Sequence, residues 1–572
     1  MTTKPADRAP RRWLAAALLA VLALAAATGT CVLTYPQLEP DDYRFLMTIQ
    51  DSADGRIGLL QASVLENRWD HLWWIEPTEA VRFFRPMLVG SYALDRALTG
   101  GTAAVMLGTN LLLHGAVVVL VALLAFRVVR TPWAAFAASV LYAAFAFHAE
   151  TMWYVAGRNE TLAALGFFGA LLLHDGPSRT RRWLVLPCYA FALLSKELTI
   201  GLPILCMAWD VLVLGRHVTW RSALVHDRWL WLGHAAVAGG VFWLRSIAVP
   251  PGSGLVFPYF VVPWHPGFGG HVVTGVRNYL ENLAIAQHTL PFMQPAHYAE
   301  FTTLGGTALG VAGLAALAFG LRRDRCARWA GLLVLVTWLP IAVVYLCERY
   351  LVLPAAGVAL GVGLAFARAR RWRWLAGAVL VAWIAHQATW QFRKNENISQ
   401  RPRDATVLRH FLVPHAAALS QAKAVYLLDF PGGTVHAQFA AAQVRHALGN
   451  ARLPVHVLTT YPMAAGRATG FDVARVDART IELMSGAPFV VAERALFPCT
   501  PLRTGTIVDR PGAGVVAEVV AGDGEAVTRL RLRLAHPIAE CVLLRWLPPT
   551  PFPAGRPHGV IAAGGRLVQL RP

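Results

Sequence analysis

Long apolar runs recur from residue 13 to residue 390 of this 572-residue chain. Several of them contain the roughly 17 to 25 apolar residues that a helix needs to cross the hydrocarbon core of a bilayer. Hydrophobic residues make up 56% of the chain, and its mean hydropathy of +0.46 is far above that of an ordinary soluble protein. The sequence therefore predicts a polytopic α-helical membrane protein.

Eleven such runs predict eleven membrane-spanning helices, several of them short. The first is expected to be a retained helix rather than a cleaved signal peptide, because no small-x-small cleavage site precedes Tyr35. The predicted spans cover residues 13–33, 103–126, 133–148, 159–174, 183–195, 198–214, 229–249, 302–321, 329–346, 350–367 and 373–390.

The stretch FALLSKELTIGLPILCMAWDVL (191–212) decides the topology, because Lys196 and Glu197 interrupt an otherwise apolar segment. Charged side chains inside lipid are costly and are rarely kept there without a use. If residues 183–214 form two spans, every arginine-rich loop lies on one side of the membrane, as the positive-inside rule requires. These loops are 127–130, 179–182, 216–228, 322–328 and 368–373. We therefore expect two spans, with Lys196 and Glu197 at the outer water–lipid boundary.

The same loops account for most of the net charge of +19, so nucleic-acid binding is not expected. The order of the spans places residues 1–12 in the cytoplasm and a transmembrane domain at 13–390, with outer loops at 35–102 and 250–301. Within the second loop, residues 272–292 predict an amphipathic or re-entrant helix against the outer face. The preference for arginine over lysine suggests a GC-rich bacterial genome, and hence a location in the bacterial inner membrane.

The C-terminal residues 400–572 differ in character from the rest of the chain. Short strand-like runs broken by glycine, proline and aspartate predict a soluble, periplasmic β or α+β domain. Cys499 and Cys541 lie in this region, where an oxidising compartment would permit a disulfide, and two buried free thiols are the alternative. The motif FPGGTVH (430–436) favours an ordinary turn over a phosphate-binding loop.

Acidic and basic side chains gather at the predicted outer ends of the spans. Charges that served only solubility would tolerate any outward position, whereas these lie where the helices converge. They are Asp41, Asp42, Arg82, Arg85, His148, Glu150, Arg158, Glu160, Lys196, Glu197, Glu348 and Arg349. The pattern indicates one polar cavity at the outer face.

Such a cavity suits the transfer of a group from a lipid phosphate. The leaving phosphate is anionic, and Lys196, Arg158 and Arg349 carry the charge that would stabilise it. An attacking hydroxyl must lose a proton to a carboxylate, and carboxylate oxygens also bind divalent cations. The candidate bases are Asp41, Asp42 and Glu150, and Asp42 is also a candidate ligand for Mg²⁺ or Mn²⁺.

Each of these residues has a structural alternative. The aspartate pair also fits a solvated turn, and His148 and Glu150 also fit the capping of helix ends. Glu348 and Arg349 also fit a structural ion pair.

Four groups of motifs follow one another in an order seen in a known family. They are FFRPMLVGSYALDRALTG with NLLLH (83–114), HAETMWYVAGRNETLAAL (148–165), LLSKELTIGLPILCMAWDVL (193–212) and ERYLVLP (348–354). These residues resemble the membrane region of the protein O-mannosyltransferases that carry tetratricopeptide repeats, and of their bacterial relatives. Those enzymes belong to the GT-C class, multi-span glycosyltransferases that use polyprenyl-phosphate sugars on the non-cytoplasmic face. The resemblance covers about residues 35–365.

The resemblance implies roles for individual residues. Asp41 and Asp42 stand at the place of an acidic motif implicated in catalysis or metal binding. The family's Ser-Lys-Glu motif is matched at residues 195–197, and its Glu-Arg-Tyr-Leu motif at 348–351. The His-x-Glu and Val-x-Gly-Arg motifs are matched within 148–158. Supporting roles are expected for His148, Glu197, Glu348 and Arg85.

The chain also departs from the family. Phe145 and Ala146 replace a His-Pro pair, and Leu107 replaces a histidine. No 34-residue helical repeats follow the membrane region, so the part that handles the acceptor differs. Asn110 and His114, one helical turn apart, are expected to bridge helices rather than to do chemistry.

We therefore expect an inverting, mannosyltransferase-like membrane glycosyltransferase with a polyprenyl-phosphate sugar as donor. Its periplasmic acceptor, a protein hydroxyl, a glycan or a lipid, stays open, and a divalent metal ion is the one cofactor considered. A transporter or flippase of lipid-linked sugars is the first alternative, and it should show polar gates at both faces. A non-catalytic membrane scaffold is the second alternative.

Overall fold

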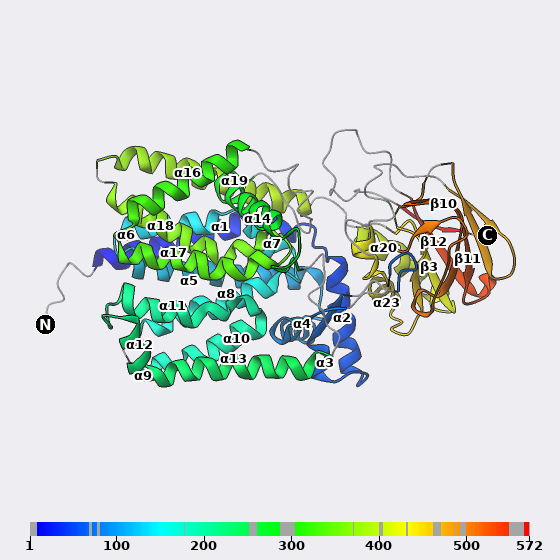
Figure 1. The fold of residues 1–572 in the computed structure, drawn as a ribbon, viewed down its shortest axis with the longest axis horizontal. Coiled ribbons are helices and arrows are strands. Elements are labelled where there is room, and N and C mark those ends of the chain that lie inside the picture. Colours follow the sequence, from blue (N-terminus) through cyan, green and yellow to red (C-terminus); the bar gives the residue numbers. More distant parts are fainter. Residues whose placement is uncertain are drawn as a thin grey trace. The chain divides into compact units, whose positions relative to one another are not determined.

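A computed structural model gives the arrangement of most of the chain. It describes residues 8–67, 71–76, 80–176, 178–250, 260–286, 304–369, 371–399, 404–430, 433–460, 471–486, 488–491, 499–547 and 566–570. The chain forms two compact units, which we describe separately (Figure 1). The helical unit comprises Met1–Pro36, Phe84–Val249 and Tyr259–Gln400, and the mixed unit comprises Gln37–Phe83, Pro250–Pro258 and Arg401–Pro572.

The helical unit consists of apolar helices, several of which begin with a proline. Proline occupies the first turn of α4, α6 and α18, where its missing N–H breaks no helical hydrogen bond. The helices are α1 (Arg8–Gly29), α4 (Pro86–Thr99), α5 (Ala103–Val128), α6 (Pro132–Ala144), α7 (His148–Trp153), α8 (Arg158–His174), α9 (Arg179–Trp183), α10 (Val185–Ser195), α11 (Leu202–Ala208), α12 (Trp220–His226), α13 (Arg228–Ala248), α14 (Phe268–Ala284), α16 (Leu304–Leu321), α17 (Arg325–Trp338), α18 (Pro354–Arg368) and α19 (Arg373–Ser399). Short 3₁₀ or π segments are η2 (Thr30–Leu33), η3 (Glu197–Gly201), η4 (Trp209–Val213), η5 (Leu339–Val343) and η6 (Glu348–Val352).

Three helical segments among the described residues are long and apolar enough to cross a membrane: Arg11–Leu33, Ala103–Val128 and Arg325–Val343. The predicted number of eleven spans is therefore not confirmed. Other predicted spans are shorter apolar helices, such as Pro132–Ala144 and Pro354–Arg368.

The apolar segment around Lys196 contains a reversal of the chain. The Arg182 guanidinium, just before α10, donates to Asp210 in η4 across 3.0 Å, so the two ends of this segment meet. At Lys196 the backbone is extended, with φ −161° and ψ 129°, and η3 follows. Figure 1 accordingly shows α9 and α12 at the same end of the α10–α11 pair. The chain therefore reverses its direction at Lys196, as the two-span prediction requires, and the membrane crossing of each arm stays a prediction.

The surroundings of Lys196 differ from the prediction. We expected water to reach both Lys196 and Glu197, but Lys196 is only 4% exposed. The two neighbours also do not pair with each other: Lys196 pairs with Glu160, and Glu197 pairs with Arg85. The extended backbone at Lys196 points successive side chains in different directions, so each finds its own partner.

The predicted amphipathic segment 272–292 corresponds in part to α14, which buries its polar face. His271, Asn278 and Glu281 are buried, whereas Val273 is 67% exposed. Such an inverted pattern suits a helix whose outer side faces lipid. Residues 287–292 lie outside the described part of the chain.

The mixed unit contains two larger sheets, in agreement with the α+β expectation. In one sheet the strands pair in the order β13-β12-β3-β4, with β3 parallel to both β12 and β4 and with α23 between β3 and β4 in sequence. The other is a seven-stranded sheet around the antiparallel pair β10–β11. Alternate residues of β10 are buried from Val515 to Val519, as a sheet with one solvated face requires.

The strands and helices of the C-terminal part have the following bounds. They are α20 (Asp404–Leu412), η7 (Val413–His415), α21 (Ala416–Leu419), β3 (Ala424–Leu428), α22 (Gly433–Ala437), α23 (Ala440–Leu448), β4 (Val455–Val457), β5 (Asp472–Arg475), β6 (Thr480–Met484), β7 (Val490–Val491), β8 (Leu502–Arg503), β9 (Ile507–Arg510), η9 (Pro511–Ala513), β10 (Val515–Gly524), β11 (Ala526–Leu534), η10 (Ile538–Glu540), β12 (Cys541–Leu547) and β13 (Arg566–Leu570).

Part of the first predicted outer loop folds with this C-terminal part. The loop forms α2 (Pro40–Ala53), α3 (Leu59–Ala62), β1 (Val64–Asn67) and β2 (Val81–Phe84). The buried Trp73 indole donates to the Leu458 carbonyl across 2.8 Å, and the Tyr43 ring lies 5.1 Å from the His446 ring of α23. The expected single loop 35–102 is therefore divided, because its aromatic side chains are buried against the C-terminal part.

The cysteines of this unit are free thiols. Cys499 is buried beside Ile75, with which it forms an isolated β-bridge, and Cys541 begins β12. The disulfide that was left open from the sequence is not formed. Of the motif FPGGTVH, residues 431–432 lie outside the described part, and α22 is too short to decide between its two readings.

Candidate functional site

Four charged side chains of the helical unit meet in one buried cluster, which we call the cationic site. It consists of Lys196, Arg349, Glu150 and Glu160. Lys196 ends α10, Arg349 lies in η6, Glu150 lies in α7, and Glu160 lies in the first turn of α8. Residues up to 199 positions apart in the sequence are therefore in contact in this site.

Lys196 is held by one carboxylate and one aromatic ring. Its ammonium group forms an ion pair with Glu160, and its Nζ lies 4.0 Å from the centre of the Tyr350 ring. The side chains of Lys196 and Glu160 are only 5% and 6% exposed. Away from water both the ion pair and the cation–π contact are strengthened, so the lysine is well fixed.

Arg349 is held mainly by Glu150. The guanidinium pairs with the Glu150 carboxylate, and the backbone N–H of Arg349 donates to the same carboxylate across 2.8 Å. The guanidinium carbon also lies 5.0 Å from the centre of the Tyr154 ring and 5.7 Å from that of Tyr350. The Tyr350 ring therefore contacts both cations of the site.

Small residues permit the close approach that forms this cluster. A Cβ at Gly166 of α8 would lie 2.8 Å from the Cys188 carbonyl of α10, so only glycine allows the two helices to pack this closely. This contact helps bring the start of α8 and the end of α10 together. At Gly157 an added Cβ would lie 3.0 Å from the Tyr154 ring and 3.5 Å from Arg349 Cδ.

Two further ion pairs lie in the same unit. The Arg85 guanidinium donates to Glu197 across 3.0 Å, and the Glu197 side chain is 40% exposed. Lys394 of α19 donates to Glu348 across 2.6 Å, and both side chains are 2% exposed. Glu348 therefore pairs with Lys394 rather than with its neighbour Arg349, which corrects the ion pair considered from the sequence. A helix longer than the predicted span 373–390 carries Lys394 to this place.

Arg158 is placed in a way that favours a structural role over phosphate binding. Its fully buried guanidinium donates to Asn110 Oδ1 at 2.7 Å and to the Met106 carbonyl at 2.7 Å. It also lies 2.8 Å from Asp95 and 3.1 Å from Ser91 Oγ. With these acceptors around it, Arg158 ties α4, α5 and α8 together.

His148 faces the interior of the bundle. Its Nε2 lies 2.9 Å from the Tyr142 carbonyl, and its ring centre is 4.7 Å from that of His114. Asn110 Nδ2 donates to the Thr151 and Tyr154 carbonyls at 3.2 and 3.0 Å, as expected of a residue that bridges helices.

Asp41 and Asp42 belong to the mixed unit. Both lie in the first turn of α2, where negative charge is favourable. The Asp42 side chain is buried and accepts the Glu39 N–H across 2.7 Å as part of a capping box. Their predicted roles as base and as metal ligand stay predictions, as does a cavity shared with the cationic site.

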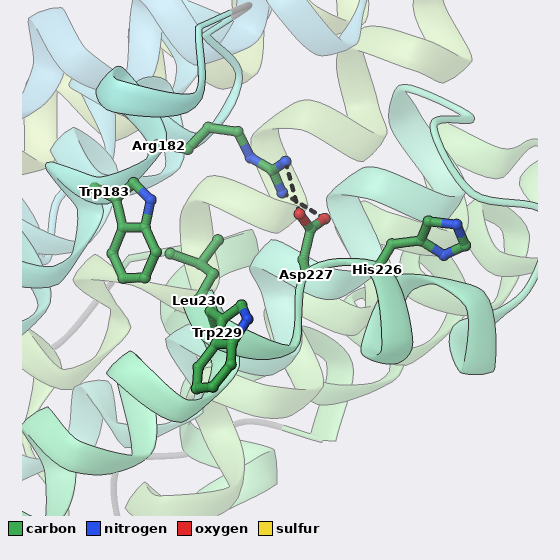
Figure 2. A pocket seen from close by; sticks show the side chains of 6 residues that line it. All are labelled: Arg182, Trp183, His226, Asp227, Trp229 and Leu230. Carbon is green, nitrogen blue, oxygen red and sulfur yellow. Dashed lines mark hydrogen bonds and ion pairs between the residues drawn. The ribbon is translucent and has the colours of Figure 1, made fainter.

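A second cluster, not predicted from the sequence, lies at the turn between α11 and α13. Asp210, His217 and Asp227 place possible metal-ligating atoms within 4.8 Å of one another. Figure 2 shows the adjoining pocket, where Arg182 faces Asp227 beside Trp183, Trp229 and Leu230.

The second cluster does not fit a metal ion. Arg182 donates to both Asp210 and Asp227, at 3.0 and 2.9 Å, and Arg216 donates to Asp210 at 2.9 Å. Two guanidinium groups thus occupy the carboxylates and would repel a cation. Burial opposes ionisation of Asp227, but hydrogen bonds and charge from Arg182 prevail and hold its pKa below the usual range. We read the cluster as an ion-pair network that joins the loops.

The sequence alone assigned no function to Glu160, and it predicted neither the pair of Lys394 with Glu348 nor the aromatic contacts of the cations. The Arg349 guanidinium also donates to the Tyr345 hydroxyl, and it lies near the Tyr350 ring. The aromatic spacing in YLCERY (345–350) was the available signal, since rings beside a buried arginine indicate cation–π contacts.

Comparisons with known proteins find distant similarities of structure. No protein-family model matches the chain, and no curated protein matches it. A crystal structure of ArnT from Cupriavidus metallidurans bound to undecaprenyl phosphate has a TM-score of 0.45 and 12% identity, covering 78% of this chain and 85% of that one. The apo state of ArnT gives 0.43 and 14%, covering 79% and 86%.

The Archaeoglobus fulgidus oligosaccharyltransferase in its apo form gives a TM-score of 0.45 and 12% identity, covering 79% of this chain and 65% of that one. At identities of 12–14%, these similarities say nothing about substrate or mechanism.

Proposed function

We propose that this protein is a membrane glycosyltransferase that moves a sugar from a polyprenyl-phosphate donor to an extracytoplasmic acceptor. One observation carries the proposal. Two cations from separate helices, Lys196 and Arg349, meet in a nearly water-free cluster at the ends of their elements. Buried charges are costly in a membrane protein, and these two cations lie together around the Tyr350 ring rather than in separate pairs. The motifs that contain these residues are those of the sequence resemblance.

The proposed chemistry follows from the charges. When the bond between the sugar and the phosphate breaks, negative charge grows on the polyprenyl phosphate. Lys196 and Arg349 would stabilise this charge, and more strongly than in water because the site is buried. An aspartate of α2, Asp41 or Asp42, is proposed to take the proton of the attacking hydroxyl. Attack opposite to the leaving phosphate would invert the sugar carbon. Mannose and the inner membrane are part of the proposal through the sequence resemblance alone.

A transfer assay tests the proposal. Protein in lipid nanodiscs would receive radiolabelled polyprenyl-phosphate sugars together with a membrane extract as the source of acceptor. We expect transfer by the wild type, with a loss of at least about a hundredfold for Lys196→Met and Asp42→Asn, in the range that one stabilising group supplies. The control is Lys423→Ala, since the Lys423 side chain is 60% exposed and pairs with Glu540 on the surface of the mixed unit.

Full activity in both Lys196→Met and Asp42→Asn would refute the site, even if the protein transferred sugar. Transport of lipid-linked sugar across a vesicle membrane without any transfer would instead favour the flippase alternative.

A further inference from the structure

The cationic site is electrically neutral as it is folded. Lys196 and Arg349 each contribute one positive charge, and Glu150 and Glu160 each contribute one negative charge. An added phosphate would leave the site with a net negative charge in a poorly solvated place, which is unfavourable. A phosphate can therefore bind well only if one of the two carboxylates gives way.

The two carboxylates are held differently. Glu150 accepts both the guanidinium and the backbone N–H of Arg349 and is 1% exposed, so its place depends on the backbone of η6. In the described part of the chain, the recorded contacts of the Glu160 carboxylate are with side chains. It pairs with the Lys196 ammonium and lies 3.9 Å from Arg349 Nε. Rotation about the Glu160 side chain would release it without any change in the backbone.

A buried donor also points to an anion at this place. Arg349 Nε has no hydrogen-bond partner in the described part of the chain, although the side chain is only 8% exposed. A buried N–H group without a partner is rare and costly. The Glu160 carboxylate oxygen, 3.9 Å away, is too far from this N–H to accept its hydrogen bond. A larger anion with several oxygens between Lys196 and Arg349 would satisfy it.

We propose that Glu160 is a displaceable counter-ion, and that the donor's phosphate takes its place between Lys196 and Arg349. The inference rests on the proposed function. A phosphodiester carries one negative charge, as Glu160 does, so the exchange keeps the site neutral. After transfer the polyprenyl phosphate carries additional negative charge. The return of Glu160 to Lys196 then competes with this product and promotes its release.

Binding of undecaprenyl phosphate to the protein in nanodiscs, followed by native mass spectrometry, tests this role. Removing the competing charge in Glu160→Gln should tighten binding about tenfold. The matched variant Glu150→Gln should tighten binding less than Glu160→Gln does, because it also weakens the contact that holds the backbone of η6 in place. In the transfer assay, Glu160→Gln should lower KM for the donor and also lower kcat, because the product leaves more slowly. A merely structural role of Glu160 would lower kcat without lowering KM.

An unchanged or weaker affinity of Glu160→Gln would overturn the proposal. If Glu160→Gln does not fold, Glu160→Asp replaces it. The shorter side chain reaches Lys196 less well, so undecaprenyl phosphate should bind about threefold more tightly. Unchanged binding by Glu160→Asp would overturn the role of Glu160 as a counter-ion. The variant Lys196→Met separates the two proposals. If Lys196→Met no longer binds undecaprenyl phosphate and Glu160→Gln does not bind it more tightly, only the proposed role of Glu160 is refuted. If Lys196→Met binds as tightly as the wild type, the phosphate site itself falls.

Discussion

The helical unit and the mixed unit treat their charged side chains differently. In the helical unit, pairs such as Lys196–Glu160 and Lys394–Glu348 are at most 6% exposed. In the mixed unit, Lys423–Glu540 keeps its partners 60% and 41% exposed. The difference follows from the surroundings: in the interior of packed apolar helices little water reaches a charge, so such a charge requires an opposite one.

Buried charge has to be interpreted with care in the helical unit. In the helical unit the pairs are so frequent that burial alone does not identify a functional residue. Arg158 is as buried as Lys196, yet it is surrounded by acceptors of the protein, whereas Arg349 keeps one N–H without a partner in the described part of the chain. The candidate site differs from these pairs because two cations, Lys196 and Arg349, lie around one ring, that of Tyr350.

The largest expected effect concerns the structural pair of the helical unit. Arg158→Ala should lower the free energy of unfolding by about 3–5 kcal/mol, because it leaves Asp95 charged and buried without its partner. Thermal unfolding in nanodiscs measures this loss. Adding Asp95→Asn, which removes the unpaired charge, should restore part of the stability. An equal loss in the single and double variants would mean that the charge of Asp95 is not responsible.

The mixed unit also contains a buried ion pair, Asp429–Arg545. Arg545 Nε donates to Asp429 across 2.8 Å, and the two side chains are 13% and 9% exposed for Arg545 and Asp429. Burial raises the pKa of Asp429 from 3.8 to about 6, and Arg545 opposes this only in part.

The raised pKa gives the pair a pH dependence with a defined sign. Between pH 4 and 6 the folded state holds a proton on Asp429 that the unfolded state has lost, so the free energy of unfolding falls as the pH rises through this window. The effect amounts to about 3 kcal/mol. Thermal unfolding of the full chain should show it, and Asp429→Asn, which tolerates the positive φ of 53°, should remove this part of the pH dependence. The same pH profile in both proteins would contradict the raised pKa.

A smaller effect should test whether the first loop depends on the C-terminal part. Trp73→Phe keeps the ring but leaves the buried Leu458 carbonyl without its donor, which should cost about 1–3 kcal/mol. Because α2 folds in the same unit, we also expect reduced sugar transfer. Hydrogen exchange of the α2 amides should quicken, while that of α5 should not. Equal changes in both helices would argue against separate units.

The smallest effect is expected at the exposed pair of the mixed unit. Lys423→Ala removes an ion pair with Glu540 at 2.9 Å, and surface pairs contribute no more than about 1 kcal/mol. Thermal unfolding in nanodiscs, as for Arg158→Ala, measures this change in stability. A loss as large as that of Arg158→Ala would remove the contrast between the two units.

The sequence by itself determined the apolar helices, the chain reversal at Lys196 and the mixed α+β character of the C-terminal part. These follow from local patterns: hydrophobic length, the distribution of arginines and alternation along strands. It also selected Lys196, Glu150 and Arg349, because their motifs stand at the ends of predicted spans.

Only the tertiary structure decided which charges pair. The pairing of Lys196 with Glu160 and of Glu348 with Lys394 depends on how helices are rotated against one another, and single-sequence periodicity fixes a helix face only approximately. The division of the first loop likewise rests on Trp73 and Tyr43, whose partners lie hundreds of residues away. Such contacts are formed by packing between distant segments, and no local pattern records them.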